Sequence, residues 1–315
     1  MILQTPVPIP DLSIKIDYES KCLFIGSCFS EHIGNKLRYH KIPTLINPFG
    51  VVFHPKPLEH LVTRAVNQLY FFNQDCFEHL EQWHSLEVHS SLNQGSQKAL
   101  ITYLNHELDV LRHKLQSATH VFITYGTAWG YKHLEKDQIV ANCHKLPQKN
   151  FAKELYSVEE VTQTTLEIVT LLKDLNPSAE VSFTVSPVRH LKDGVVQNTL
   201  SKAHLIAGIH QAREKEPRIG YLPAYEIMMD ELRDYRFYQD DMIHPNLTAI
   251  DYIFERFKEA CIAPLAYKTM SKVLDIQKGL AHRPFNENSE ANQRFLAQLN
   301  EKISTLQKEV PQISF

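Results

Sequence analysis

Cysteine is scarce in this sequence, and the residues present do not indicate a disulfide framework. There are five, with no Cys-x-x-Cys pair among them: Cys22, Cys28, Cys76, Cys143 and Cys261. Small secreted domains that depend on disulfides carry cysteines at high density and usually in even number. The sequence therefore favours free thiols in a reducing compartment, and we expect a cytoplasmic protein.

Long apolar runs and an excess of basic residues are missing as well. No segment approaches the ~20 consecutive apolar residues that a transmembrane helix needs. The N-terminal stretch MILQTPVPIPDLSIKI has neither the cationic start nor the unbroken apolar segment that is typical of a signal peptide. With 33 Lys and Arg against 36 Asp and Glu, the formal net charge is −3. The chain thus offers no basic field, and we expect neither nucleic acid nor a membrane as a partner.

Motifs for metal binding are also missing. Cys143 and His144 are adjacent and the chain has 17 histidines, but it contains no HExxH, no CxxC and no second close pair of ligands. Structural and catalytic zinc sites normally show such spacings. We therefore expect no metal and no cofactor.

Three apolar runs alternate with helical patterns, and this alternation indicates the fold class. The runs are 22–25, 120–126 and 180–187, and helical patterns at 97–117 and 154–175 precede the second and third. Such alternation predicts an α/β domain with a mostly parallel sheet and helices on both faces. Ligands of these sheets bind beyond the carboxyl ends of the strands. The three strand ends should therefore face one crevice.

Two further parts of the chain fit less simply. Residues 47–95 break the alternation of strands and helices. They are expected to form an insertion, which can include a hairpin. After Asn246, a plausible helix N-cap, apolar residues at helical spacing close the main domain, 1–265. Residues 266–315 are polar and helical, with an interruption at HRPFNENSE, and predict a two-helix extension.

A carboxylate and an imidazole near the end of the domain form the first candidate for chemistry. Asp241 and His244 stand on the loop before the last helix of the domain, since Pro245 keeps His244 out of helical geometry. In a nucleophile–base pair the imidazole takes the proton and the carboxylate orients it. The structural alternative is that Asp241 caps a turn and His244 is a surface residue. The partner would be Ser27 or Cys28, on the turn after the first strand.

Motifs spread over nearly the whole chain resemble the GSCFA family. They are GSCF at 26–29, NPFG at 47–50, YGTAW at 125–129, SPVRHLKDG at 186–194 and DMIHP at 241–245. The family is placed in the SGNH, or GDSL-like, hydrolase superfamily, whose members are mostly esterases, lipases, deacetylases and carbohydrate O-acyltransferases. The resemblance implies a flavodoxin-like three-layer αβα sandwich, the SGNH hydrolase fold, with a nucleophile after the first strand and a D-x-x-H element near the last helix.

Within this resemblance the nucleophile is the third residue of Gly-Asp-Ser, a position that Cys28 occupies here. A cysteine at a helix N-terminus with a histidine in reach has a lowered pKa and forms a thiolate more readily. We therefore expect the pKa of Cys28 to lie below the usual ~8.5. The alternative is that Ser27 attacks and Cys28 is a small buried apolar residue. His244 is the expected base, with His190 and His144 as alternatives.

The asparagine that stabilises the oxyanion in the superfamily is missing. Its motif is Gly-x-Asn, and here Gly126 is followed by Thr127 and Ala128. One lost donor of this kind costs on the order of 10² to 10³ in rate. Backbone N–H groups at residues 28 and 29 and at Gly50 are the expected remaining donors, and Gly126 is included as a candidate.

Asn47 and Asn142 are candidates to replace the missing asparagine side chain. Both stand on loop-like segments after apolar runs, and Pro48 is expected to restrict Asn47 to an extended backbone. Each asparagine can equally be a turn residue.

Substrate contacts are expected after the second and third strands. Arg189 and His190 can hold a carboxylate or sugar hydroxyls, although Arg189 can instead pair with Asp193. Trp129 and Tyr131 can form a stacking wall for a sugar or belong to the core.

The expected function is therefore a hydrolase of the SGNH type that acts on a small-molecule or carbohydrate ester, on a thioester or on an acetylated carbohydrate through an acyl-enzyme. A carbohydrate O-acyltransferase with the same intermediate is the first alternative. The second is a non-catalytic carbohydrate-binding or scaffold module that has lost the oxyanion asparagine.

Overall fold

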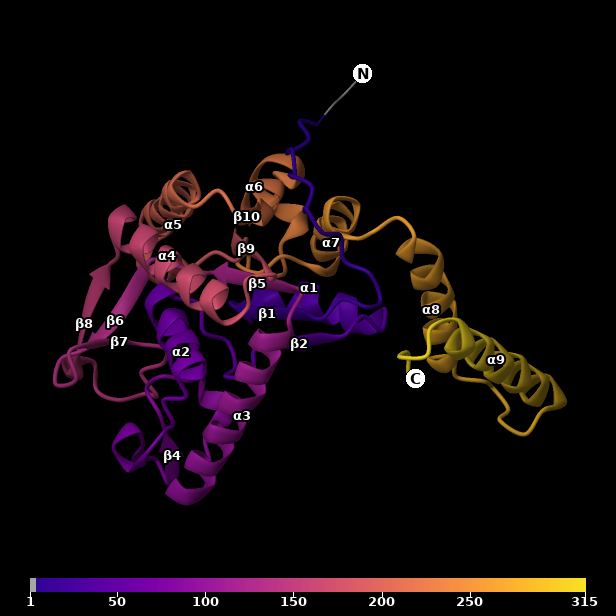
Figure 1. Ribbon diagram of the computed structural model, residues 1–315, viewed down its shortest axis with the longest axis horizontal. Helices are drawn as coiled ribbons and strands as arrows, with labels where there is room; N and C mark the ends of the chain where they lie inside the picture. Colours follow the sequence, from indigo (N-terminus) through magenta and orange to yellow (C-terminus); the bar gives the residue numbers. More distant parts are fainter. Residues whose placement is uncertain (1–3) are drawn as a thin grey trace.

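The computed structural model describes residues 4–315, and its centre is a five-stranded parallel sheet (Figure 1). In spatial order the strands are β10 (Ile219–Leu222), β9 (Glu180–Val185), β5 (His120–Tyr125), β1 (Cys22–Gly26) and β2 (Thr44–Ile46). All four neighbouring pairs are parallel. Counted along the chain, these five strands follow the order 2-1-3-4-5, which is the flavodoxin-like arrangement.

The central strands are apolar on both faces, and each face has its own helical layer. In β5, Val121 and Ile123 pack with one hydrophobic cluster and Phe122 with the other. Strands of a parallel sheet covered on both sides need this unbroken apolar character. The expected α/β sandwich with a parallel sheet and helices on both faces is confirmed.

The helices divide between the two faces of the sheet. One face carries α2 (Pro55–Asn67), α3 (Gln97–Ser117), α4 (Val158–Leu175) and α5 (Val195–Lys215). The other carries α1 (Cys28–Tyr39), the short α6 (Ala224–Glu226), which runs into a π-helical turn at Ile227–Leu232, and α7 (Leu247–Cys261). Short 3₁₀ turns at Asn73–Asp75, Ser90–Leu92, Gln148–Asn150, Leu191–Asp193 and Tyr235–Phe237 connect these elements.

Two small antiparallel sheets lie outside the sandwich. The hairpin of β3 (Phe77–His79) and β4 (Gln82–His84) lies in the region expected to be an insertion, 47–95, which also contains α2. A second sheet has the order β7-β6-β8, with β6 (Trp129–His133), β7 (Gln138–Val140) and β8 (Phe151–Leu155). The sequence did not indicate this second sheet, which follows β5 directly and forms one wall of the site described below.

The expected C-terminal helical extension is confirmed. Helices α8 (Ala266–Leu280) and α9 (Glu290–Glu309) project from the α7 side of the domain (Figure 1). Val273 on α8 and Leu299 on α9 belong to the hydrophobic cluster of that side. The chain end returns to the domain, where the side-chain amide of Gln312 donates to the carbonyl of Tyr18 at 3.1 Å.

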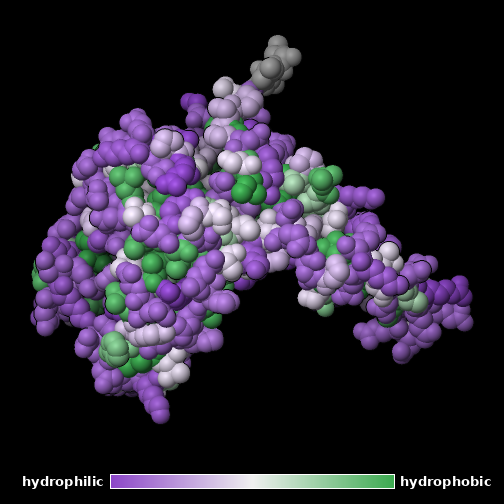
Figure 2. Space-filling model, viewed as in Figure 1, coloured by the Kyte–Doolittle hydropathy of each residue, from purple (hydrophilic) through white to green (hydrophobic). Residues whose placement is uncertain are grey.

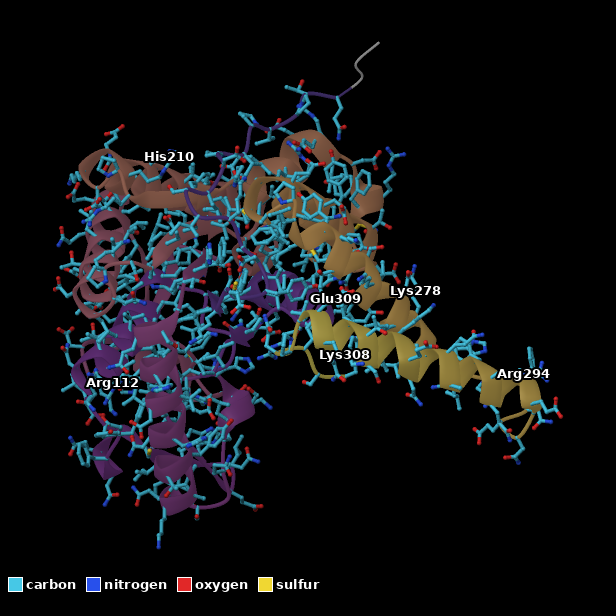
Figure 3. The ribbon with its side chains drawn as sticks, turned by 45° about the vertical axis from the view of Figure 1, so that its right-hand side comes forward. Arg112, His210, Lys278, Arg294, Lys308 and Glu309 are labelled. Carbon is cyan, nitrogen blue, oxygen red and sulfur yellow. The ribbon has the colours of Figure 1, made fainter. Side chains whose placement is uncertain are left out.

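The surface of the molecule is largely hydrophilic on the face shown in Figure 2, where apolar side chains gather only in small separate groups. Charged side chains labelled in Figure 3, including Lys278 and Arg294, lie along the helical extension. Within residues 4–315 no helix combines the length and the apolar character that a membrane span requires.

The turn after β1 depends on Gly26, which has φ +130. A Cβ at this position would lie 2.2 Å from the carbonyl oxygen of Thr124 on β5. The next residue, Ser27, donates its N–H to the same carbonyl at 3.0 Å. The absence of a side chain at Gly26 therefore allows the first turn of α1 to begin directly beside the end of β5.

Replacing Gly26 with Ala should lower the free energy of unfolding by at least about 3 kcal/mol, because it combines a left-handed backbone with a backbone clash. Gly95→Ala is the matched control, since an added Cβ there meets nothing within 4 Å; it should change stability by less than about 0.5 kcal/mol. Urea unfolding of both variants measures the difference, and equal stability would contradict the close approach.

Candidate active site

Ser27 and Cys28 occupy different places on the turn after β1. Ser27 is the N-cap of α1: it is 2% exposed, and its Oγ accepts the N–H of Phe29 at 3.3 Å. Cys28 is the first residue of the helix and is only partly buried. The thiol is thus the more accessible of the two groups, while the hydroxyl has a structural partner.

The pKa of Cys28 is raised, and the expectation of a lowered value was wrong. Burial is the largest cause, and the negative charge of Glu31, three residues along α1, adds to it. The backbone N–H groups of Cys28 and Phe29 and the charge of Lys202 act in the opposite direction. The helix N-terminus therefore favours the thiolate as expected, but it does not outweigh desolvation. Cys28 is a protonated thiol in the resting protein, and attack by it requires a base.

Asp241 and His244 form a directly bonded pair. Nδ1 of His244 lies 2.6 Å from Oδ2 of Asp241, and Oδ1 of Asp241 accepts the N–H groups of Ile243 at 2.8 Å and of His244 at 3.0 Å. The backbone and side-chain hydrogen bonds from His244 lower the pKa of Asp241 to about 2. The carboxylate therefore stays ionised and keeps a proton on Nδ1, which leaves Nε2 of His244 as the atom able to accept a proton.

His244 lies near the turn that carries Cys28. It interacts electrostatically with His32, which is one turn beyond Cys28 on α1, and with His190, which follows β9. Among residues 4–315 no hydrogen bond joins Cys28 to either His244 or His190. Catalytic hydrogen bonds of unliganded enzymes are often long and shorten when the substrate binds.

A buried lysine completes this group of side chains. Lys202 on α5 is 1% exposed, and its Nζ donates to the carbonyl of Gly126 at 2.6 Å and to that of Ser186 at 2.7 Å. These carbonyls follow the ends of β5 and β9. Burial lowers the pKa of Lys202 to about 7, although the neighbouring Cys28 favours the charged form. The carboxyl edge of the sheet therefore holds a cation whose charge depends on pH near neutrality.

The NPFG segment supports the turn after β1 through Asn47. Its Oδ1 accepts the N–H of Gly26 at 2.9 Å, and its Nδ2 donates to Glu31 at 3.3 Å. The expected extended backbone was wrong: Asn47 has φ 40, and its carbonyl accepts the N–H of Gly50 at 2.8 Å. The polar groups proposed as oxyanion donors in this segment thus already have partners in the turn.

Gly126 and Asn142 also have partners elsewhere. The N–H of Gly126 donates to the carbonyl of Phe53 at 2.7 Å. Oδ1 of Asn142 accepts the N–H of His144 at 2.8 Å, which is the pattern of a turn residue. His144 is 4% exposed and its ring lies between His84 and the carbonyl of Ser85. Both of its ring nitrogens therefore already have partners.

Ser201 supports the segment in which the superfamily asparagine is missing. Its Oγ accepts the N–H of Ala128 at 2.7 Å and lies 2.8 Å from Oγ1 of Thr127. Together with Lys202, the next residue of α5, it fixes the loop after β5. The position of the missing amide is thus occupied by a fully buried alanine whose backbone is anchored to α5.

A cavity of about 650 Å³ adjoins this group. Arg189, His190, Trp129 and Asn142, all candidates from the sequence, line it, whereas Cys28 and the Asp241–His244 pair do not. The two sites meet at His190 and at Ile243, the neighbour of His244. Nε2 of His190 lies 3.1 Å from the Cβ that a side chain at Gly126 would have.

His190 remains neutral in this position. Burial lowers its pKa to about 3, and the charges of Lys202 and His244 act in the same direction. Its Nε2 is buried without a hydrogen-bond partner among the described residues. Arg189, in contrast, extends over the rings of Tyr235 and Tyr238, and the alternative pairing with Asp193 is taken by Lys153.

The model of the GSCFA family matches residues 21–257, which include β1, most of α7 and every candidate residue of the site. The chain belongs to the GSCFA family. A second family model, described as the C-terminal domain of GSCFA domain proteins, matches residues 273–315 and thus most of the helical extension. No curated protein matches the chain.

Sequence reasoning missed two members of this GSCFA site, Lys202 and Glu31. Lys202 is three and seven residues before Leu205 and Ile209, so a lysine stands on the apolar stripe of α5. That position was the available signal for a buried cation. Glu31 had no such signal, since an acidic residue in the first turn of a helix is common.

In the described part of the chain, no three His, Cys, Asp or Glu residues are grouped so as to hold a metal.

The buried charge of Lys202 predicts a pH-dependent stability. Its folded pKa of about 7 lies below the ~10.4 of an unfolded lysine, so the unfolded chain binds more protons between these values and stability rises with pH. From pH 7 to pH 9 the parent protein should gain about 2 kcal/mol relative to Lys202→Met.

Urea unfolding at the two pH values measures this difference. The matched control is Lys173→Met, which also removes hydrogen bonds to two backbone carbonyls, those of Pro177 and Ala179, but from a partly exposed lysine. It should follow the pH dependence of the parent. An identical pH dependence of Lys202→Met and the parent would show that the lysine does not titrate in this window.

Proposed function

We propose that the protein is an acyl hydrolase of the SGNH type that acts on an ester, thioester or acetylated carbohydrate through an acyl-enzyme on Cys28. The observation that carries the proposal is the Asp241–His244 pair, ordered by three hydrogen bonds to one carboxylate. His244 acts electrostatically on His32 of α1, the helix that follows β1, and on His190, which follows β9. The strand order reverses between β1 and β5, and ligands of open parallel sheets bind beyond the carboxyl ends of the strands at such a point.

The reaction begins with attack by the Cys28 thiol on the carbonyl carbon of the acyl group. As the bond between sulfur and carbon forms, Nε2 of His244 takes the thiol proton, and Asp241 stabilises the resulting imidazolium. The tetrahedral intermediate then expels the alcohol or thiol, which receives that proton from His244. A water molecule, deprotonated by His244, finally attacks the thioester, releases the acid and restores the thiol.

A base is required in this scheme because burial and Glu31 keep the Cys28 thiol protonated. Transfer of its proton to His244 during attack avoids a thiolate in the resting protein. Lys202 favours the negative charge as it forms, since its cation lowers the pKa of Cys28. The N–H groups of Cys28 and Phe29 act in the same sense. The N–H of Cys28 is the proposed backbone donor to the oxyanion, since that of Phe29 donates to Oγ of Ser27.

Lys202 is our proposed substitute for the missing asparagine. An ammonium group has three N–H donors, and two of them are directed to Gly126 and Ser186. The third can act on charge that develops beside Cys28, in a site with little water. Asn47 and Gly50 are less suited to this role, because Nδ2 of Asn47 donates to Glu31 and the N–H of Gly50 donates to the carbonyl of Asn47. The side chain of Asn142 already accepts the N–H of His144 within its own turn.

Incubation with p-nitrophenyl acetate should acetylate Cys28, which intact-mass and peptide mass spectrometry can locate. Cys28→Ala should abolish the modification. Cys143→Ala is the matched control, since Cys143 is also a partly buried thiol with a raised pKa. Ser27→Ala should remain competent and lose about 1 kcal/mol of stability as an N-cap. Acetylation at Ser27, or none at all, would refute the assignment, and the latter would favour a binding module.

Asp241→Asn should reduce the acylation rate by up to about 10⁴ while the protein stays folded, because the imidazole loses its orientation and the partner for its charge. Asp240→Asn changes the adjacent exposed carboxylate and should have little effect. Stopped-flow release of p-nitrophenol gives the rates. Equal rates for the two variants would show that Asp241 only caps its turn.

A further inference from the structure

The cavity beside the proposed nucleophile has an unusual distribution of charge. Its lining includes four cationic side chains and one carboxylate, in a chain whose formal net charge is −3. The cationic residues are Lys145, Lys153, Arg189 and Lys192, and the carboxylate is Asp193. Its volume of about 650 Å³ is in the usual range for sites of small ligands.

Aromatic side chains of the small antiparallel sheet hold two of these lysines in place. Nζ of Lys153 lies 5.0 Å from the ring centroid of Trp129 and also contacts Asp193. Nζ of Lys192 lies 5.6 Å from the ring centroid of Tyr131 and donates to its hydroxyl at 3.4 Å. Cation–π contacts of this kind orient an ammonium group without neutralising it.

Arg189 and Lys145 are the other two cationic residues of the lining. The guanidinium of Arg189 lies over two tyrosine rings and donates to the carbonyl of Met242 at 3.4 Å, without a carboxylate partner in the described chain. Lys145 is exposed on a turn with φ 60 and has no ion pair among residues 4–315. Among the described residues, the one carboxylate of the lining, Asp193, is matched by Lys153, which leaves three cations without an ion pair.

We infer that this cavity binds a ligand that carries a phosphate or diphosphate group. A single carboxylate would neutralise one of the three uncompensated cations, whereas a diphosphate offers several negative oxygens over a longer span. Lysines act as point charges for phosphate and arginine as a planar donor, and both kinds are present here. The aromatic wall of Trp129 and Tyr131 is largely engaged with the lysines, which makes the pocket a poor stacking platform for a neutral sugar.

The cavity meets the nucleophile region at His190 and Ile243. Neutral His190, with its free Nε2 beside Gly126, can contact the part of the ligand that passes from the cavity toward Cys28. The inference rests on the proposed function only for the claim that the ligand is the acyl substrate. The pocket would then hold the phosphorylated end of an acyl ester, with the acyl group at Cys28.

Isothermal titration calorimetry with inorganic pyrophosphate tests the inference on the full chain. Cys28→Ala should bind as the parent does, so binding is measured independently of catalysis. We expect saturable binding that weakens with added salt, and weaker binding of inorganic phosphate and of acetate. No binding of pyrophosphate, or acetate bound as tightly as pyrophosphate, would overturn the inference.

Charge reversal locates the site. Lys192→Glu should weaken pyrophosphate binding about 10-fold or more, whereas Lys302→Glu, an exposed lysine on α9, should change it by less than about twofold. Circular dichroism and thermal unfolding check that both variants fold. The exposed Lys145→Ala gives a milder change on the same cavity and should also weaken binding. Equal effects of Lys192→Glu and Lys302→Glu would place pyrophosphate outside the cavity and overturn the inference.

If pyrophosphate binds and acylation of Cys28 is never seen, the anion site stands and the acyl-transfer proposal fails. If Cys28 is acylated and pyrophosphate does not bind, the acyl-transfer proposal stands and the anion site fails. The two proposals therefore fail on different results.

Discussion

The contact between Gly26 and the end of β5 is the constraint on which the geometry of the site depends. A side chain at Gly26 would meet the carbonyl of Thr124, and that carbonyl also fixes the N–H of Ser27. Asn47 holds the other side of the same turn by accepting the N–H of Gly26. Because the turn is fixed from both sides, α1 begins at Cys28 directly at the reversal point of the sheet. The NPFG segment thus supports the position of Cys28 through the turn before it.

Opposing electrostatic effects on the Cys28 thiol, at the carboxyl end of the sheet, explain the proposed chemistry. Burial and Glu31 disfavour a thiolate at Cys28, while Lys202 and the backbone N–H groups favour one. Burial also lowers the pKa of Lys202, so neither group is charged without cost. A site of this kind keeps the thiol unreactive at rest and gains most from its fixed dipoles when charge develops on an acyl group. The neutral His190 keeps a further positive charge out of this region.

The sequence was sufficient for the elements with long and uniform patterns. The runs at β1, β5 and β9 and the helical patterns of α3, α4 and α7 were recognised because their apolar residues continue over whole elements. Strands β2 and β10 have only three and four residues, too few for a periodic signal. The sheet of β6, β7 and β8 was also missed, because in WGYKH aromatic and charged side chains mix without a regular period.

For the site, the sequence indicated that Asp241 and His244 lie together, but it did not give the direction of the Cys28 pKa or the backbone conformation of Asn47. Asp241 and His244 were recognisable because Pro245 and the helix after it define their loop. The direction of the Cys28 pKa depends on burial by segments distant in sequence, which local rules about helix termini do not include. The backbone of Asn47 was mispredicted for the same reason, since tertiary hydrogen bonds to Gly26 and Glu31 override the local effect of Pro48.

The most direct test of the central claim compares two pH profiles of Cys28 in the same protein. Alkylation by iodoacetamide reports the fraction of free thiolate, and acylation by an activated ester reports attack assisted by a base. The account predicts that acylation proceeds at pH values where alkylation shows the thiol still protonated, and that His244→Ala removes this low-pH acylation. Profiles that rise together at the pKa of the thiol, unchanged by His244→Ala, would contradict it.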